Sequence, residues 1–275
     1  MAAEFALDDE VKTLASTGAQ MLTLGKSGGR AVHVLLLSQD EVEQLQVLEL
    51  AGQRRLVFSR QQAWVAKGQL QLRGPATAPL QAALFPALPH PKAPGLVVTR
   101  DGPLQQLSLP GTVAEPALQV VPQRQPGRAP PLLKGGLANA ALQPIPEAFA
   151  SAAGWALKLP AALPPSAEEV LLELDFVGDI GRLFFGTRLL DDWYYNGQRW
   201  QVGLRQFGLK GGETLDLNVL PLRADAPIYI DASHRPTFPE GSTQVAALRS
   251  VRLLPLRRVS IAPCCLLYTS DAADE

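Results

Sequence analysis

The distribution of proline is the feature of this sequence that most limits how it can fold. The chain holds 24 prolines, of which none precedes Pro75 and eighteen fall between Pro75 and Pro165. Proline lacks the amide hydrogen that a sheet ladder needs and disrupts helix interiors, so it is confined to edge strands, strand ends and turns. Residues 75–149 are therefore predicted to be a proline-rich linking region with edge strands.

Composition places the chain among globular proteins. Of its 275 residues 47% are hydrophobic and 19% are charged, which is enough apolar material for a core. The formal net charge of -1 gives no reason to expect nucleic-acid binding. No apolar run approaches the roughly 20 residues that cross a bilayer, so no membrane partner is expected. The acidic first residues do not resemble a secretory signal, and the compartment stays open.

The end of the chain is unusual. Its only cysteines, Cys264 and Cys265, are adjacent, where a disulfide is strained and metal-ligand spacing is absent. The last residues resemble translated sequencing-adapter read-through. We therefore expect 263–275 to be a non-native tail and the chain to be a fragment of a longer polypeptide.

Residues 1–74 are predicted to form a β-rich domain with one helix. The apolar run 31–37 indicates a buried strand. Ser38 and Glu41 then match a capping box, which predicts a helix start, and apolar residues at roughly helical spacing extend this helix to Gly52. Further strands are expected at 55–58 and, as a hairpin joined across Lys67-Gly68, at 64–65 and 70–72.

Residues 150–262 carry the strongest β pattern. In 169–176 the apolar residues alternate, and 214–219 alternates in the same way, which is typical of strands with one buried face. Such short strands separated by turns predict a β-sandwich of the jelly-roll type, although an immunoglobulin-like strand order is compatible with the same pattern. The expected fold class is thus mostly β, with a smaller β-rich domain before the sandwich.

Residues typical of catalytic and metal sites give little support for chemistry in this chain. Gly25–Gly29 matches a nucleophile elbow with Ser27 at its tip, but a strand rather than the required helix follows, so a hairpin turn is expected instead of a hydrolase site. The acidic pairs Glu168-Glu169 and Asp191-Asp192 point to opposite faces of a strand, so neither is a glycosidase pair. No metal or cofactor is expected, because the histidines lie far apart in the sequence: His33, His90 and His234.

The segment 189–200 concentrates aromatic and polar residues. Four aromatic residues lie within 193–200, in a chain that is only 6% aromatic. Aromatic faces stack on sugar rings, and neighbouring Asp or Asn side chains bind hydroxyls. The candidate carbohydrate-binding residues are Asp192, Trp193, Tyr195, Asn196 and Trp200. Alternatively, these rings close the end of the sandwich or pack on a neighbouring domain.

The same segment carries a family resemblance. Val170–Phe184, Leu190–Leu204 and Val219–Ile230 resemble the C-terminal β-rich region of bacterial glycoside hydrolase family 35 β-galactosidases. Three earlier stretches resemble the β-domain that precedes this region in those enzymes: Ala3–Leu7, Val32–Ser38 and Gly52–Ser59. The resemblance is weakest through the proline-rich middle, and it implies that the C-terminal jelly roll is galactose-binding-like.

The resemblance implies a part of an enzyme rather than a whole one. Such enzymes cleave terminal β-galactosyl residues with retention, using two glutamates on an N-terminal barrel. A barrel needs about 250 residues of alternating strands and helices, a pattern that this sequence lacks. The Asn-Glu dipeptide that marks the acid/base residue in the family does not occur here either. We carry over no catalytic residue and expect accessory β-domains that support the catalytic barrel domain and contact galactosides. The alternatives are a free-standing carbohydrate-binding module and a structural interaction domain without a ligand.

Overall fold

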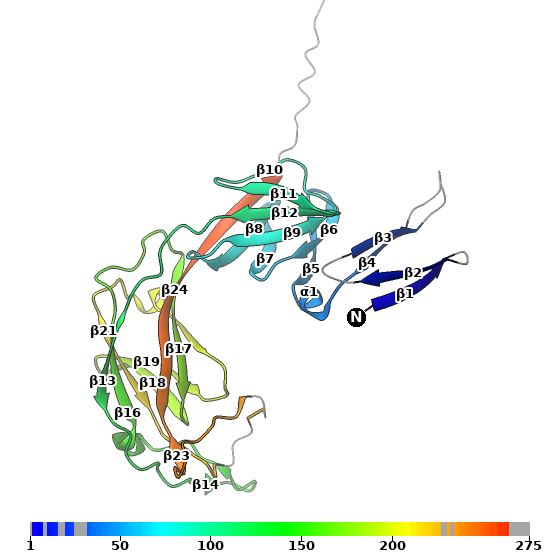
Figure 1. Ribbon diagram of the computed structural model, residues 1–275. Helices are drawn as coiled ribbons and strands as arrows, with labels where there is room; N and C mark the ends of the chain where they lie inside the picture. Colours follow the sequence, from blue (N-terminus) through cyan, green and yellow to red (C-terminus); the bar gives the residue numbers. More distant parts are fainter. Residues whose placement is uncertain are drawn as a thin grey trace, which may run out of the picture. The chain divides into compact units, whose positions relative to one another are not determined.

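A computed structural model describes residues 2–7, 10–15, 20–24, 32–226, 230–231 and 234–263. Ser27 and residues 264–275 of the expected tail 263–275 lie outside the described residues, whereas Pro263 is the last residue of a strand. The described chain is mostly β, built from antiparallel sheets, which confirms the predicted fold class (Figure 1). It divides into two compact units, unit 1 (1–74, 78–111 and 258–275) and unit 2 (75–77 and 112–257).

Unit 1 buries its core between two sheets. One sheet has the strand order β11 (Val97–Asp101), β12 (Leu104–Leu109), β9 (Leu80–Phe85), β6 (Gln53–Phe58) and β5 (Leu45–Leu50). The other contains β7 (Gln62–Ala66), β8 (Gln69–Pro75), β10 (Pro91–Lys92) and the end of β24 (Ala247–Pro263). Val57 and Leu84 of the first sheet pack in one apolar cluster with Leu72 and Ile261 of the second. Two hairpins precede these sheets: β1 (Ala2–Leu7) with β2 (Glu10–Ala15), and β3 (Gln20–Leu24) with β4 (Val32–Leu36).

The helix is shorter than the sequence pattern predicts. α1 (Gln39–Glu43) begins with the expected capping box, in which the Glu41 amide donates to Ser38 Oγ at 3.3 Å and the Ser38 amide donates to the Glu41 carboxylate at 2.7 Å. The predicted extension to Gly52 is wrong, because residues 45–50 form β5 and Gly52 lies in a hairpin turn. Leu50 is buried in the strand that pairs with β6. The stabilisation that comes from this pairing cannot be seen in the spacing of apolar residues along the sequence. No helix in the described ranges is long and apolar enough to cross a membrane.

The prolines of the middle segment border strands more often than they interrupt them. β9 lies between Pro79 and Pro86, and β12 between Pro103 and Pro110, so these two inner strands keep every ladder amide. The sequence predicts a linking region over 75–149. In the structure, residues 78–111 of this region belong to unit 1. β13 (Gln119–Arg124) contains Pro122, and it is an edge strand whose register shifts at this residue.

Unit 2 is a β-sandwich (Figure 1). One sheet has the order β13, β16 (Ala153–Lys158), β21 (Thr214–Val219), β18 (Ile180–Phe185) and β19 (Arg188–Tyr194). The facing strands are β20 (Trp200–Gly203), β17 (Glu169–Val177) and the first part of β24. Short elements complete the unit: β14 (Lys134–Gly135), β15 (Ala140–Ala141), β22 (Leu222–Arg223), β23 (Gln244–Val245) and the 3-10 helices η1 (Pro146–Ser151) and η2 (Arg205–Phe207).

Alternation in two strands builds the sandwich core as predicted. The inward residues of β17 and β21 are at most 1% exposed and belong to one apolar cluster: Val170, Leu172, Leu174, Phe176, Leu215, Leu217 and Val219. Because the two strands belong to facing sheets, this cluster is the interior of the sandwich. Burying each of these side chains stabilises the fold by about 1.5–3 kcal/mol before entropy is counted.

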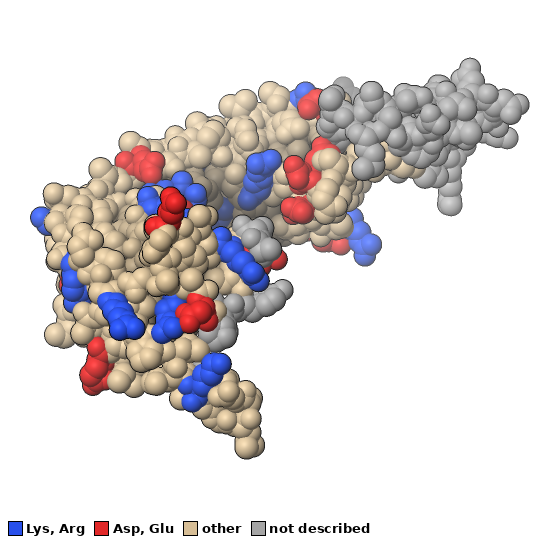
Figure 2. Space-filling model, turned by 60° about the horizontal axis from the view of Figure 1, so that its bottom comes forward, with Lys and Arg blue, Asp and Glu red and all other residues tan. Residues whose placement is uncertain are grey.

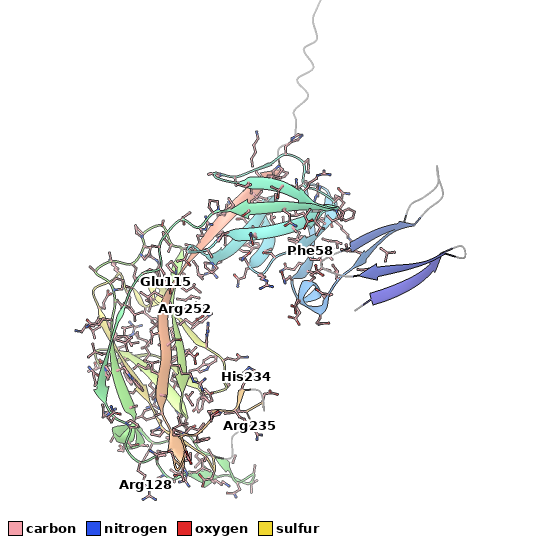
Figure 3. All side chains as sticks on the ribbon, in the orientation of Figure 1. Phe58, Glu115, Arg128, His234, Arg235 and Arg252 are labelled. Carbon is pink, nitrogen blue, oxygen red and sulfur yellow. The ribbon has the colours of Figure 1, made fainter. Side chains whose placement is uncertain are left out.

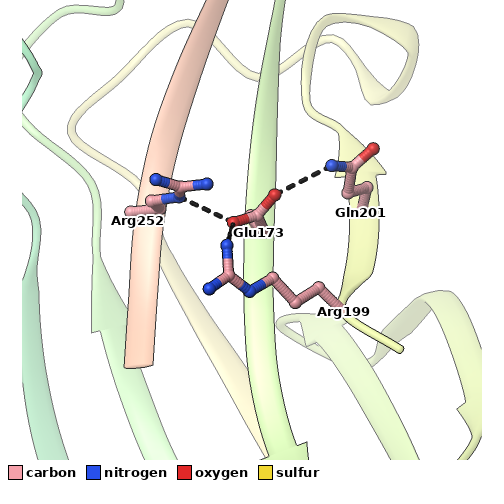
Figure 4. A network of polar contacts seen from close by, with 4 residues as sticks. All are labelled: Glu173, Arg199, Gln201 and Arg252. Atoms are coloured by element: carbon pink, nitrogen blue, oxygen red, sulfur yellow. Dashed lines mark hydrogen bonds and ion pairs between the residues drawn. The ribbon is translucent and has the colours of Figure 1, made fainter. Parts of the chain in front are cut away.

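On the opposite face of β17, Glu173 links three strands. Its carboxylate accepts hydrogen bonds from Arg252 Nε at 2.6 Å, Gln201 Nε2 at 2.8 Å and Arg199 Nη1 at 3.1 Å (Figure 4). Burial pushes the pKa of Glu173 upward, but the hydrogen bonds from Arg252 and Gln201 and the charges of Arg252 and Arg199 outweigh it. The pKa of Glu173 therefore lies below its usual value.

Charged side chains of both signs are interspersed on the face that Figure 2 shows. Lysines and arginines do not gather there into one large patch. This distribution matches the near-zero formal net charge of the sequence.

Candidate functional site: a pocket on unit 2

Two rings of the aromatic segment belong to the core. Trp200 is 0% exposed and Tyr195 is 7% exposed. Both pack edge-to-face on Phe176, with ring centroids 6.0 and 5.9 Å away. A ring enclosed in this way offers no face to a ligand, so the candidate role of Tyr195 and Trp200 as sugar platforms is corrected to a packing role.

The other three candidate residues do not come together to form a binding site. Trp193 is partly buried against the core cluster, and Asp192 is paired across the ladder with Arg182. Asn196 is exposed, and its Oδ1 accepts a hydrogen bond from the Gln198 amide at 2.9 Å, which shapes the turn. None of the five candidates lines the pocket described next.

The exposed ring of the segment is that of Tyr194. It is 54% exposed, and the backbone of Tyr194 pairs with Ile180 at the end of β19. Tyr194 lines a pocket with a volume of about 210 Å³. The rest of its wall is largely apolar and includes Pro130, Pro131, Leu133, Leu142, Pro144 and Pro221.

Asp179 brings a carboxylate to this pocket. It lies in the turn between β17 and β18, where its amide donates to the Leu220 carbonyl at 2.8 Å and its carbonyl accepts from the Tyr195 amide at 2.9 Å. In the part of the chain that the structure describes, the Asp179 carboxylate has no hydrogen bond and no ion pair. Burial raises the pKa of this carboxyl.

Gly178 permits the close approach that places Asp179. A Cβ atom on Gly178 would lie 2.3 Å from Val219 Cγ1 and 2.8 Å from the Leu220 carbonyl oxygen. Because the second of these is a backbone atom, a side chain here would displace the turn that holds Asp179.

Arg223 is the other charged residue of the pocket wall. Its Nε and Nη2 donate to the two oxygens of Asp225 at 2.8 and 2.7 Å. This bidentate pair balances the charge of the guanidinium, and no described cation pairs with Asp179. The pocket therefore combines apolar walls, one exposed ring and one carboxylate that no described residue pairs. A ring can stack on the C–H face of a sugar, and a carboxylate can accept bonds from two adjacent hydroxyls.

Sequence reasoning singled out the aromatic segment but did not select Tyr194 or Asp179, which line the pocket. The ladder register shifts between Leu183 and Phe184, which leaves Leu190 unpaired, so alternation counted from Leu190 does not predict the face of Tyr194. For Asp179 the available signal was a Gly-Asp pair between two apolar strands, which indicates a turn but not a pocket.

The three histidines belong to different segments of the structure. His33 is on β4 in register with Thr23, His90 is in unit 1 and His234 is in unit 2 beside Arg235 (Figure 3). Across the described ranges, no group of three or more His, Cys, Asp or Glu side chains is arranged to hold a metal ion.

No protein-family model, curated protein or solved structure matches the chain.

Proposed function

We propose that this chain is the accessory, non-catalytic β-part of a β-galactosidase of the family 35 type, and that its pocket binds a sugar ring. One observation carries the sugar-binding claim: the Asp179 carboxylate, unpaired among the described residues, lines a largely apolar pocket beside the exposed ring of Tyr194. Both residues lie within the stretches that resemble the family. In this proposal bond cleavage belongs to glutamates of a catalytic barrel domain outside this chain.

The energetics favour a small polar ligand. A half-buried carboxylate without a donor destabilises the free protein, and each hydrogen bond that a ligand donates to it contributes about 1.5–3 kcal/mol. The pocket volume of about 210 Å³ lies below the roughly 300–1,000 Å³ of pockets for drug-sized ligands, which suits a ligand as small as a single sugar ring. Because such a site buries little area, we expect affinities in the millimolar range, about -4 kcal/mol.

A second candidate function is docking to a partner domain without a ligand. Four apolar side chains of the segment 133–145, which contributes to one wall of the pocket, are exposed: Leu133, Leu137, Leu142 and Ile145. Contiguous exposed apolar surface marks interaction sites. This function predicts no sugar binding and poor solubility of the isolated chain.

Calorimetric titration of the chain with galactose and lactose separates the two functions. Sugar binding predicts a heat that saturates at millimolar sugar and is lost in Tyr194→Ala. The matched control is Phe185→Ala, which removes an exposed aromatic side chain outside the pocket and should bind as the parent chain does. Heats equal to dilution from the folded parent chain would reject sugar binding. Neither protein should release nitrophenol from a β-galactoside at an enzymatic rate.

A further inference from the structure

The charge balance of the pocket is the starting point for a narrower ligand class. Arg223 is matched by Asp225 through two short hydrogen bonds, at 2.8 and 2.7 Å, so this pair presents little net charge. Asp179 has no such partner among the described residues. The prolines and leucines of the wall carry no charge. With Arg223 counted together with its partner Asp225, which lies outside the lining, the carboxylate of Asp179 is the one unmatched charge among the described lining residues, and it is negative.

A carboxylate in these surroundings gains more from a cation than from a neutral donor. Partial removal from water strengthens its attraction to a positive charge, and a charge-assisted hydrogen bond is about twice as strong as a neutral one. The face of the Tyr194 ring, which is 54% exposed, also attracts cations through its negative quadrupole. Two independent features of the same pocket thus favour a positively charged group.

We propose that the pocket selects a sugar that carries a protonated amine over the neutral sugar with the same ring. The ring stacks against Tyr194 and the apolar wall, and the ammonium group donates to the Asp179 carboxylate. This inference rests on the proposed function, because it assigns the ligand class of the same pocket. The raised pKa of Asp179 agrees with this inference, because a bound cation would offset the cost of burying the charged carboxylate without a partner.

The test compares galactosamine, galactose and methylamine by titration of the full chain at pH 6 and fixed ionic strength. The parent chain should bind galactosamine roughly tenfold more tightly than galactose, as one charge-assisted hydrogen bond implies. Asp179→Asn should bind the two sugars equally. Asp216→Asn is the control, because Asp216 is a carboxylate on β21 that does not line the pocket, and it should keep the full preference.

Each outcome decides the inference. Equal affinities in the parent chain, or a preference that survives Asp179→Asn, would overturn it while galactose binding still supports the proposed function. Methylamine that binds as tightly as galactosamine would overturn the role of the ring. If neither sugar binds, both the inference and the proposed function fail. Thermal melts of all three proteins show whether a loss of binding reflects unfolding.

Discussion

The indole N–H of Trp200 donates a hydrogen bond to Asp191 Oδ2 at 2.9 Å within unit 2. Trp200 begins β20 and Asp191 lies on β19, strands that belong to different sheets of the sandwich. The bond therefore joins the two layers where the aromatic segment turns from one to the other. It also satisfies the one polar atom of a fully buried ring.

Loss of this ring should be among the most destabilising single changes in unit 2. Trp200→Ala removes a side chain that is 0% exposed, and we expect the free energy of unfolding to fall by about 3–5 kcal/mol. Trp200→Phe keeps most of the packing but removes the hydrogen bond to Asp191 Oδ2, so a smaller loss of about 1–3 kcal/mol is expected. Urea unfolding measures both, with exposed Phe185→Ala as the control. A loss below about 1 kcal/mol for Trp200→Ala would contradict the core assignment.

Glu173 should make unit 2 sensitive to acid. Because its folded pKa lies below the unfolded value, its stabilising contribution is fully present above the unfolded pKa of about 4.3 and is lost as the pH falls through the lower folded pKa. Glu173→Gln should cost about 1–2 kcal/mol at neutral pH, a modest value because Arg199 and Arg252 are half-exposed. Unfolding curves between pH 7 and pH 3 test this. The variant should lose less stability on acidification than the parent chain, and parallel curves would refute the assignment.

Asp179 should contribute a pH dependence of stability opposite in sign to that of Glu173. Its folded pKa is raised, so the folded state binds more protons between the two pKa values, and stability falls as the pH rises through this window. Asp179→Asn removes this penalty and should leave the chain as stable as, or more stable than, the parent at pH 7. Thermal melts at pH 7 measure the change. Clear destabilisation would show that the carboxylate has a structural partner and is not held free for a ligand.

Two glycines with left-handed backbone allow the cost of backbone strain to be distinguished from the cost of steric crowding. Gly186 has φ +59, and a Cβ atom there would meet no described atom within 4 Å, whereas Gly211 has φ +117 and its Cβ would lie 2.5 Å from Ala162 Cα. Gly186→Ala should therefore cost about 1 kcal/mol, from backbone strain alone. Gly211→Ala should cost about 3 kcal/mol or more, because backbone must also move. Similar losses for both variants in urea unfolding would contradict this local geometry.

The parts of the fold that follow local rules were predictable from sequence. Alternation in β17 and β21 identified the buried face of each strand, the Ser38–Glu41 capping box located the helix start, and Lys67-Gly68 joins a hairpin with positive φ at both residues. The end of α1 was not predictable in this way. Apolar spacing in 42–48 suits a helix as well as a strand, and pairing of β5 with β6 decides between them.

The site depended on contacts that sequence does not display. Aromatic density marked 193–200 correctly as unusual, but it could not distinguish buried Tyr195 from exposed Tyr194, because their neighbours come from β17 and from the segment 130–144. Asp179 lines the pocket without a described cationic partner, and Arg223, the other charged residue of the wall, is paired with Asp225. This combination of partners appears only in three dimensions.

The central claim is that the pocket at Asp179 and Tyr194 binds a sugar, and amide chemical-shift mapping tests it most directly. Galactose added at millimolar concentration to the isotope-labelled chain should shift the amides of residues that line the pocket, including Leu133, Asp179 and Tyr194, and leave β5 to β9 of unit 1 unchanged. Tyr194→Ala should abolish these shifts. An unchanged spectrum, or shifts confined to unit 1, would contradict the account.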